Sequence, residues 1–322
     1  MALNASPNLF LVGASKAGTT SIHHYLNQHP DVFMSPIKEP HFLADEVRPD
    51  NFCEEMRLRI EARSAALREF LDGPACEPFS GGPVTSWEDY QKLFKCAGES
   101  RVIGESSPCY LWSRSAPANI SARFPTAKIA MILRNPVERA FAQYAHMLMF
   151  AAAPVSFREH VEQALESKDT RISELYPFLE FGAYSEQVTR YLALFPPENV
   201  RVFFYEDLTN APDLLLRQMF RFLEVSDDFS VNMSKRHMRA LVPRSFALNN
   251  VLRATGLWDA ARLLPEGFRD RVKGRLYRKR DAMKLFPADR EWLVDYYRED
   301  VIALGTLLKR DLSAWLTLPA SS

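Results

Sequence analysis

A glycine-bracketed loop near the N-terminus contains the residue types of an anion-binding site. Gly13 and Gly18 enclose Lys16, and three hydroxyl-bearing residues follow, namely Thr19, Thr20 and Ser21. Loop amides and the positive end of a helix dipole favour a negatively charged ligand, and the lysine adds a full positive charge. The ligand expected here carries a phosphate or a closely related anionic group.

The position of the lysine narrows the choice of ligand. Nucleotide-triphosphate loops follow G-x-x-x-x-G-K-[ST], with the lysine directly after the second glycine. Here Gly13 and Gly18 keep that glycine spacing, but Thr19 stands in the lysine's place and the lysine comes earlier, at Lys16. The alternative is an ordinary strand-to-helix turn with a surface lysine. Two glycines, a lysine and several hydroxyls in one short loop favour the anion site.

Apolar runs predict the elements that position this loop. Strands are expected over Leu9–Val12, Val32–Met34, Lys128–Leu133 and Val200–Tyr205. Continuous apolar runs are typical of central parallel strands. Helical patterns occupy 45–75, 86–94, 137–149, 214–223 and 290–308, and a loop that could border a site lies at 77–83. Strands that alternate with helices predict α/β architecture, with a central parallel sheet flanked by helices. We expect a single domain over 1–322 with a core of about 8–315.

The composition excludes several classes of partner. Of the 322 residues, 47% are hydrophobic and 25% charged, and Lys+Arg and Asp+Glu both total 40, so no strong field attracts nucleic acid. No apolar run is long enough to span a membrane, and no leader pattern opens the chain. A basic run at 271–280 is expected to be a solvated helix face.

The four cysteines do not have metal-ligand spacing. They are consistent with reduced thiols, although a single Cys53–Cys76 or Cys76–Cys96 bridge is an open alternative. Together with the lack of a predicted membrane span or leader, this cysteine usage leads us to expect a cytoplasmic protein.

Several motifs resemble one enzyme family. Lys16–Thr20 is similar to the 5′-phosphosulfate loop of the sulfotransferases that use 3′-phosphoadenylyl sulfate (PAPS), and Arg134–Tyr144 is similar to their 3′-phosphate motif. Further similar motifs occur in the family's order at Lys38–Phe42, Gly104–Tyr110, Gly182–Tyr184, Tyr205–Leu208, Glu299–Asp300 and Asp311–Trp315. The set runs from residue 9 to 315 and resembles most the branch of heparan-sulfate and bacterial carbohydrate-type enzymes. The resemblance implies a P-loop-like fold.

The resemblance also implies roles for individual residues. Lys16 neutralises charge on the bridging oxygen of the donor, and Arg134 binds the 3′-phosphate. The residues expected to hold the 5′-phosphate are Ala17, Gly18, Thr19, Thr20 and Ser21. A basic cluster lies where the family closes a loop over the nucleotide, and from it we select Lys235 and Arg239 over Arg236 and Arg244. No metal is expected.

An acceptor hydroxyl needs a general base within hydrogen-bond reach. The family pattern places a glutamate at Glu39, with Lys38 and His41 able to orient it or adjust its pKa. Glu105 is the alternative base, and His146 is a weaker candidate for a role in the site.

Two positions depart from the family pattern. Ala142 stands where a serine binds the 3′-phosphate, and Ser106 stands where the heparan branch has a lysine. Loss of one hydroxyl contact costs about 1 kcal/mol. The second departure argues against a heparan-type acceptor in particular.

The expected reaction is in-line transfer of a sulfuryl group from PAPS to a hydroxyl, less readily to an amine. The expected products are adenosine 3′,5′-bisphosphate (PAP) and a sulfated glycan, lipid or small molecule. Two alternatives stay open: a P-loop nucleotide kinase or triphosphatase, and a catalytically weak nucleotide-binding protein. The sequence predicts no oligomeric state.

Overall fold

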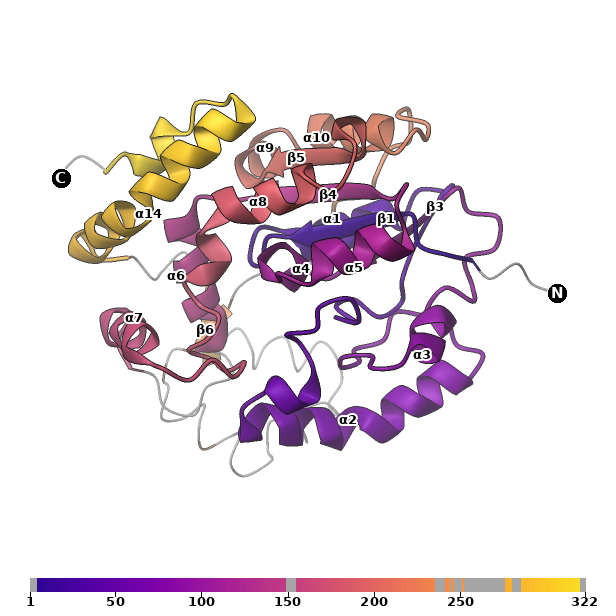
Figure 1. Ribbon diagram of the computed structural model, residues 1–322, viewed down its shortest axis with the longest axis horizontal. Helices are drawn as coiled ribbons and strands as arrows, with labels where there is room; N and C mark the ends of the chain where they lie inside the picture. The colour runs from indigo at the N-terminus through magenta and orange to yellow at the C-terminus, as the bar shows by residue number, and fades with distance from the viewer. Residues whose placement is uncertain are drawn as a thin grey trace.

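A five-stranded parallel sheet forms the centre of the molecule (Figure 1). The computed structural model describes residues 5–148, 155–234, 241–243, 245, 251, 276–279 and 285–318. The strands are β1 (Leu9–Gly13), β2 (Val32–Met34), β3 (Val102–Ser106), β4 (Lys128–Leu133) and β5 (Val200–Phe204), in the spatial order β2-β3-β1-β4-β5. The expected α/β class with a central parallel sheet is confirmed.

The order of the strands indicates where a ligand is expected to bind. Strand β1 lies between β3 and β4, and Phe10 pairs with Glu105 on one side and Ile129 on the other. The chain moves from β1 towards β2 and β3 on one side, and later to β4 and β5 on the other. Ligands of open α/β sheets bind beyond the carboxyl ends of the strands at such a reversal. The loops after β1 and β4 occupy this position.

Helices surround the sheet, with α4 and α5 across one face and α2 at the opposite side of the molecule from α10 in Figure 1. The helices are α1 (Thr19–Leu26), α2 (Glu54–Asp72), α3 (Trp87–Lys92), α4 (Cys109–Trp112), α5 (Ala116–Arg123), α6 (Pro136–Met147), α7 (Phe157–Glu166), α8 (Tyr184–Leu192), α9 (Tyr205–Asn210), α10 (Pro212–Phe222) and α14 (Pro287–Leu308). Shorter elements are the 3₁₀ turns η1 (Pro49–Asn51), η2 (Glu180–Gly182), η3 (Pro197–Asn199) and η6 (Ser313–Leu316), and an antiparallel pair, β6 (Leu241–Pro243) and β7 (Tyr277–Lys279).

Strand β3 is the strand of the central sheet that was not predicted from the sequence. Only Val102 and Ile103 are apolar, and Gly104, Glu105 and Ser106 complete the strand although Glu105 and Ser106 are fully buried. Buried polar residues interrupt the apolar run that marks the other central strands. Gly104 fits here because a Cβ would lie 2.3 Å from the sulfur of Met34.

The C-terminal helix is tied to the body of the fold by a carboxylate. Asp300 of α14 accepts hydrogen bonds from the amides of Tyr184 (2.7 Å) and Ser185 (3.0 Å) at the first turn of α8. Trp315 packs against Tyr184 and donates to Glu206 over 3.1 Å. The terminal motifs therefore hold α8, which precedes β5, and α9, which follows it.

One disulfide links two surface segments. Cys76, in the loop after α2, is bonded to Cys96, just beyond α3, whereas Cys53 and Cys109 are free thiols. This corrects the expectation of reduced thiols for two of the four cysteines, and the pair formed is one of the two bridges left open.

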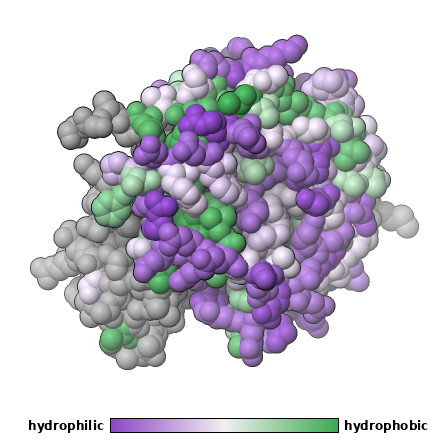
Figure 2. Space-filling model, turned by 60° about the vertical axis from the view of Figure 1, so that its left-hand side comes forward, coloured by the Kyte–Doolittle hydropathy of each residue, from purple (hydrophilic) through white to green (hydrophobic). Residues whose placement is uncertain are grey.

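The surface is mixed in polarity. On the face shown in Figure 2, hydrophobic side chains form small groups between hydrophilic ones. Within the described ranges, no helix combines the length and the apolar character needed to cross a bilayer.

Candidate active site

The loop after β1 is held in a compact turn at the carboxyl end of the sheet. The amide of Ala14 donates to the carbonyl of Ile132 on β4 over 2.7 Å, and the amide of Ala17 returns to Ala14 over 3.2 Å. Lys16 has a left-handed backbone, with φ of 65°. The turn thus places the lysine between the ends of β1 and β4.

Gly18 is required by both conformation and space. Its φ is 91°, and a Cβ there would lie 2.7 Å from a methyl carbon of Leu208 and 3.3 Å from the ring of Tyr205. Both neighbours belong to the motif at the start of α9. The motif around Tyr205 therefore closes against the anion-binding loop, a role that its residue types alone did not reveal.

The N-terminus of α1 has no side-chain cap. The first amides of an α-helix have no intrahelical acceptor. Gly18, which caps α1, has no side chain to satisfy them. The buried Thr19 begins the helix, and Thr20 follows on its first turn. These donors suit an anionic oxygen.

Lys16 is partly desolvated. Burial lowers its pKa to about 8, with Lys38 and Arg139 lowering it further and Glu39 opposing them. Near neutral pH the ammonium is still the main form, although it is easier to deprotonate than an exposed lysine. Lys16 therefore has a charge that an incoming anion would stabilise.

Arg134 follows β4 and joins the loop. Its Nη1 donates to the carbonyl of Lys16 over 3.0 Å, and its guanidinium carbon lies 4.4 Å from the ring centre of Tyr205. Tyr184 donates to the Arg134 carbonyl over 3.0 Å, which fixes the backbone. A buried, stacked guanidinium is a preorganised oxyanion donor.

Glu39 lies in a tight turn against the end of β3. Its φ is 67°, and its amide donates to the carbonyl of Ser106 over 2.9 Å. The carboxylate is paired with the ammonium of Lys38, and the Glu39 side chain is 44% exposed, so solvent reaches it. Desolvation raises the pKa of Glu39, but Lys38, His41 and Lys16 outweigh it and bring the pKa to about 2.

The Lys16 ammonium and the Glu39 carboxylate interact electrostatically. The Glu39 carboxylate raises the pKa of Lys16, and the Lys16 ammonium lowers the pKa of Glu39. Burial lowers the pKa of His146 on α6 to about 4, and the charges of Lys16 and Glu39 also affect this pKa. The structure therefore brings a cation, a carboxylate and a neutral imidazole together at the predicted site.

His41 has contacts at its backbone and at its ring. Its amide donates to Ser107 Oγ over 3.2 Å, and its Nδ1 lies 3.0 Å from the sulfur of Cys109. Burial lowers the pKa of the imidazole, with Glu39 opposing this shift. Neither Ser107 nor Cys109 was among the site residues predicted from the sequence.

Glu105, the alternative base, is enclosed. It is fully buried, and its carboxylate accepts hydrogen bonds from Tyr90 and from Ser107, the latter at 2.7 Å. Burial raises the pKa of Glu105 to about 7. A buried carboxyl with these partners is less accessible to an acceptor hydroxyl than the partly exposed Glu39.

The loop at 77–83 and the residue after it lie against the segment that carries Glu39. The amide of Phe79 donates to Pro36 over 2.9 Å, and the amide of Val84 donates to Pro40 over 2.8 Å. The segment that carries Glu39 is thus flanked by the loop that Cys76 ties to Cys96.

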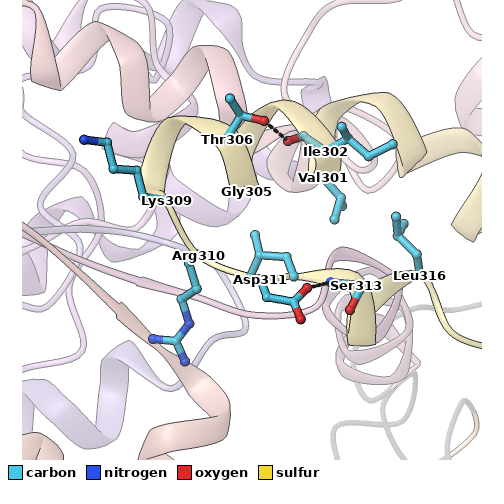
Figure 3. Close-up of a pocket in the computed structure, with 10 residues that line it drawn as sticks. Val301, Ile302, Gly305, Thr306, Lys309, Arg310, Asp311, Ser313 and Leu316 are labelled. Atoms are coloured by element: carbon cyan, nitrogen blue, oxygen red, sulfur yellow. Dashed lines mark hydrogen bonds between the residues drawn. The ribbon is translucent and has the colours of Figure 1, made fainter.

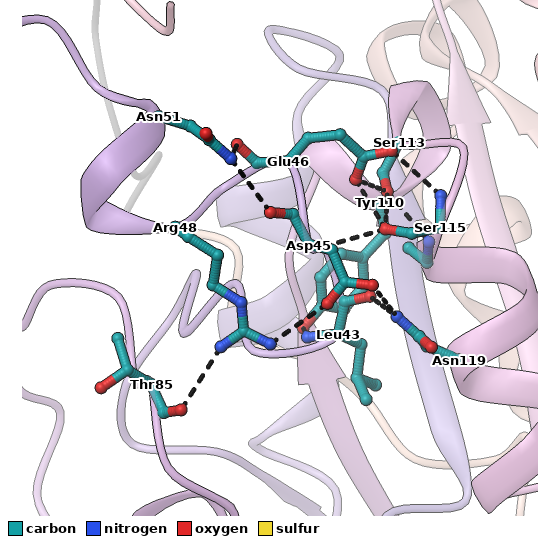
Figure 4. Close-up of polar contacts among 11 residues, drawn as sticks. Leu43, Asp45, Glu46, Arg48, Asn51, Thr85, Tyr110, Ser113, Ser115 and Asn119 are labelled. Carbon is teal, nitrogen blue, oxygen red and sulfur yellow. Dashed lines mark hydrogen bonds and ion pairs between the residues drawn. The ribbon is translucent and has the colours of Figure 1, made fainter.

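A carboxylate network anchors the other end of this segment (Figure 4). Glu46 accepts hydrogen bonds from both Ser113 Oγ and Ser115 Oγ at 2.6 Å, and from the amides of Arg114 and Ser115. Asp45 pairs with Arg48 over 3.2 Å. These contacts fasten the segment after His41 to the start of α5.

Some residues of the predicted motifs have structural roles, and others lie outside the described residues. Arg139 is fully buried and donates to Gln143 and to the carbonyl of Phe178, so it holds the fold together. Lys235, Arg236, Arg239 and Arg244, and most of the basic run at 271–280, lie outside the described ranges. In the part of the chain that the structure describes, no cluster of three or more His, Cys, Asp or Glu has metal-site geometry.

A separate cavity lies away from these residues (Figure 3). Its volume is about 420 Å³, and it lies between the C-terminal part of α14 and η6. Thr306 donates to the carbonyl of Ile302 over 3.1 Å, and the amide of Ser313 donates to Asp311 over 2.9 Å, so these polar groups pair with each other. The cavity does not include the loop lysine or the carboxylates described above.

Comparison with known proteins identifies the family. A model of the sulfotransferase family matches residues 7–229. The chain belongs to the sulfotransferase family. This confirms the resemblance seen in the motifs and the enzyme class that it implies.

Individual relatives agree with this assignment. The chain is 25% identical over 259 residues to mouse carbohydrate sulfotransferase 15, and the match covers 69% of this chain and 44% of the relative. It is 25% identical over 319 residues to mouse bifunctional heparan sulfate N-deacetylase/N-sulfotransferase 3, covering 96% of this chain and 31% of the relative. The chain thus spans less than half the length of each of these two curated relatives.

A solved structure matches nearly the whole chain. The sulfotransferase from Alicyclobacillus acidocaldarius is 28% identical, with a TM-score of 0.71, and the match covers 97% of this chain and all of that one.

Proposed function

We propose that this sulfotransferase transfers the sulfuryl group of PAPS to an acceptor hydroxyl, with Lys16 as the cation at the reacting group and Glu39 as the general base. The observation that supports the proposal is that both residues lie in turns beyond the carboxyl ends of parallel strands, Lys16 after β1 and Glu39 against the end of β3, and that each shifts the pKa of the other. An amine is the less favoured acceptor.

The residues around the loop fit a phosphosulfate donor. Gly18 leaves no space for a Cβ, and the first amides of α1 lack a side-chain cap, so the cradle offers donors to an anionic oxygen. Lys16, Ala17, Gly18, Thr19, Thr20 and Ser21 would hold the 5′ end, and Arg134 the 3′-phosphate. We retain Lys235 and Arg239 as further donor contacts. The donor supplies the sulfuryl group and a phosphate leaving group.

Two side chains of the protein then compensate the charge that develops and accept the proton that is released. The Lys16 ammonium compensates negative charge on the leaving phosphate oxygen as its bond to sulfur breaks. Glu39 is ionised at neutral pH and accepts the proton of the attacking hydroxyl as the new oxygen–sulfur bond forms. Positioning and electrostatics supply most of the catalysis in such transfers. The proposal does not require a metal.

The acceptor is best sought among carbohydrates. Two relatives named above are, by name, a carbohydrate sulfotransferase and a heparan sulfate N-sulfotransferase. Ser106, which is buried without a hydrogen-bond partner for its Oγ among the described residues, replaces the lysine of the heparan branch. We therefore propose a glycan hydroxyl ahead of a lipid or a small molecule, and a glycan other than heparan sulfate.

Transfer of radiolabelled sulfate from PAPS to a panel of glycans, lipids and phenols tests the reaction. With the best acceptor, Lys16→Ala is expected to lower kcat by about a hundredfold to a thousandfold, as for loss of a group that stabilises developing charge. Glu39→Gln should lower kcat while the thermal stabilisation by PAP persists. If Glu105→Gln is the damaging change and Glu39→Gln is not, the base is misassigned. ATP with Mg²⁺ in place of PAPS provides the control, because turnover of ATP alone would indicate a P-loop kinase or triphosphatase.

A further inference from the structure

The turn after β3 holds His41 at two points. Ser107 Oγ accepts the His41 amide at 3.2 Å and itself donates to Glu105 at 2.7 Å. Two residues later, the sulfur of Cys109 lies 3.0 Å from His41 Nδ1. Because His41 has a left-handed backbone with φ of 59°, which is uncommon for a residue with a side chain, its conformation depends on such partners.

The protonation states of the pair restrict the contact. Burial raises the pKa of the Cys109 thiol well above its usual value, so the sulfur keeps its proton. Burial lowers the pKa of His41, so the imidazole is neutral near pH 7. A neutral imidazole has one N–H and one acceptor nitrogen, and a thiol is a weak donor and a weak acceptor.

Two arrangements of protons are then possible across the 3.0 Å contact. In one, the thiol donates to Nδ1 and the imidazole proton is on Nε2. In the other, Nδ1–H donates to sulfur and Nε2 is left as an acceptor. The lone pair of an imidazole nitrogen is the better acceptor, because sulfur accepts only weakly.

We propose that Cys109 and Ser107 are positioning residues that set the backbone and the tautomer of His41, so that His41 presents an Nε2–H donor beside Glu39. Cys109 fixes which nitrogen has the proton, and Ser107, supported by the buried Glu105, fixes the left-handed turn. The hydrogen bond made by one ring nitrogen determines the state of the other. The proposal deepens the proposed function, and it rests on Glu39 and His41 acting at the reacting centre.

Nitrogen-15 NMR of the histidine-labelled protein tests the tautomer directly. His41 is assigned from the resonances that disappear in His41→Gln. In the wild type, Nδ1 is expected to give the signal of an unprotonated nitrogen and Nε2 that of a protonated one. A protonated Nδ1 in the wild type would overturn the proposal.

Variants of the sulfur separate positioning from packing. Cys109→Ala is expected to mix the two tautomers and to lower kcat about tenfold, the effect of one lost hydrogen bond of about 1.4 kcal/mol, with KM for PAPS unchanged. Cys109→Ser, which keeps a donor, should restore the single tautomer and most of kcat. The matched control is Cys53→Ala, because Cys53 is the other free thiol and lies before α2.

The backbone contact has its own test. Ser107→Ala should lower kcat while the Nδ1 signal of His41 stays unprotonated, because the ring contact with Cys109 remains. A wild-type tautomer and full activity in both Cys109→Ala and Ser107→Ala would refute the positioning role. If instead Glu39→Gln keeps full activity while the tautomer is as expected, the proposed base fails and the assignment of His41 stands.

Discussion

Arg134 Nη1 donates a hydrogen bond to the backbone carbonyl of Lys16 over 3.0 Å, although the two residues are 118 positions apart. This contact joins the loop after β1 to the end of β4. The guanidinium therefore supports the backbone of the lysine and stacks on Tyr205, whose ring also lies beside Gly18. The two motifs that resemble the donor-binding motifs of the family are thus in direct contact.

The state of Lys16 predicts the alkaline side of the pH profile. Since burial lowers its pKa to about 8, kcat/KM should fall as pH rises through this value, because deprotonation removes the charge that stabilises the leaving group. The profile of kcat should fall at a higher pH, because a bound anion favours the ammonium form and raises the pKa.

An arginine provides the control for this profile. Lys16→Arg keeps its charge over the whole range and should lose the alkaline fall in kcat/KM, at a lower absolute rate. A wild-type profile that stays flat well above pH 8 would show that another group supplies the charge.

The ion pair of Lys38 with Glu39 predicts a change on the acidic side. Lys38→Ala removes a positive partner of the carboxylate, so the pKa of Glu39 should rise from about 2 towards its ordinary value of 4.5. The sign follows because loss of an opposite charge disfavours the ionised form. The pH below which kcat/KM falls should therefore increase. An exposed lysine without this contact serves as control: Lys168→Ala should leave the acidic limb where it is.

Ala142 predicts a gain of donor affinity. It is 4% exposed on α6, in the helix that Arg134 precedes. Ala142→Ser should lower KM for PAPS about fivefold, which corresponds to about 1 kcal/mol from one hydroxyl contact. Ala142→Cys adds similar volume with a poor hydrogen-bonding group. Equal effects of the two variants on KM would assign the change to packing.

Local patterns predicted the parts of this molecule that depend on local chemistry. Strands β1 and β4 appear in the sequence as apolar runs because both of their faces are buried. The loop proposed to bind an anion is recognisable because its glycines, lysine and hydroxyls lie within one short stretch, from Gly13 to Ser21. Strand β3 was missed because Glu105 and Ser106 are polar residues in a fully buried strand.

Contacts between distant segments were out of reach of such patterns. His41 and Cys109 are 68 residues apart, and their contact exists only because two turns meet at the end of β3. The sequence favours Glu39 over Glu105 as the base but does not show that Glu105 is fully buried whereas Glu39 is partly exposed. Connectivity between cysteines likewise does not follow from spacing alone.

The Cys76–Cys96 disulfide predicts a redox effect on acceptor use. A bridge between residues 20 apart stabilises the fold by about 3 kcal/mol through the unfolded chain, so Cys96→Ser or a dithiol reductant should lower the melting temperature.

The bridged loop lies against Pro36 and Pro40, beside Glu39. Its release should raise KM for the acceptor more than KM for PAPS, because the proposed donor site lies at the ends of β1 and β4. Thiol titration of the unfolded protein checks the starting state: two thiols confirm the bridge, whereas four fit the reduced, cytoplasmic protein expected from the sequence. If acceptor and donor KM respond equally to reduction, the loop does not border the acceptor path, and its contact with the Glu39 segment is only structural.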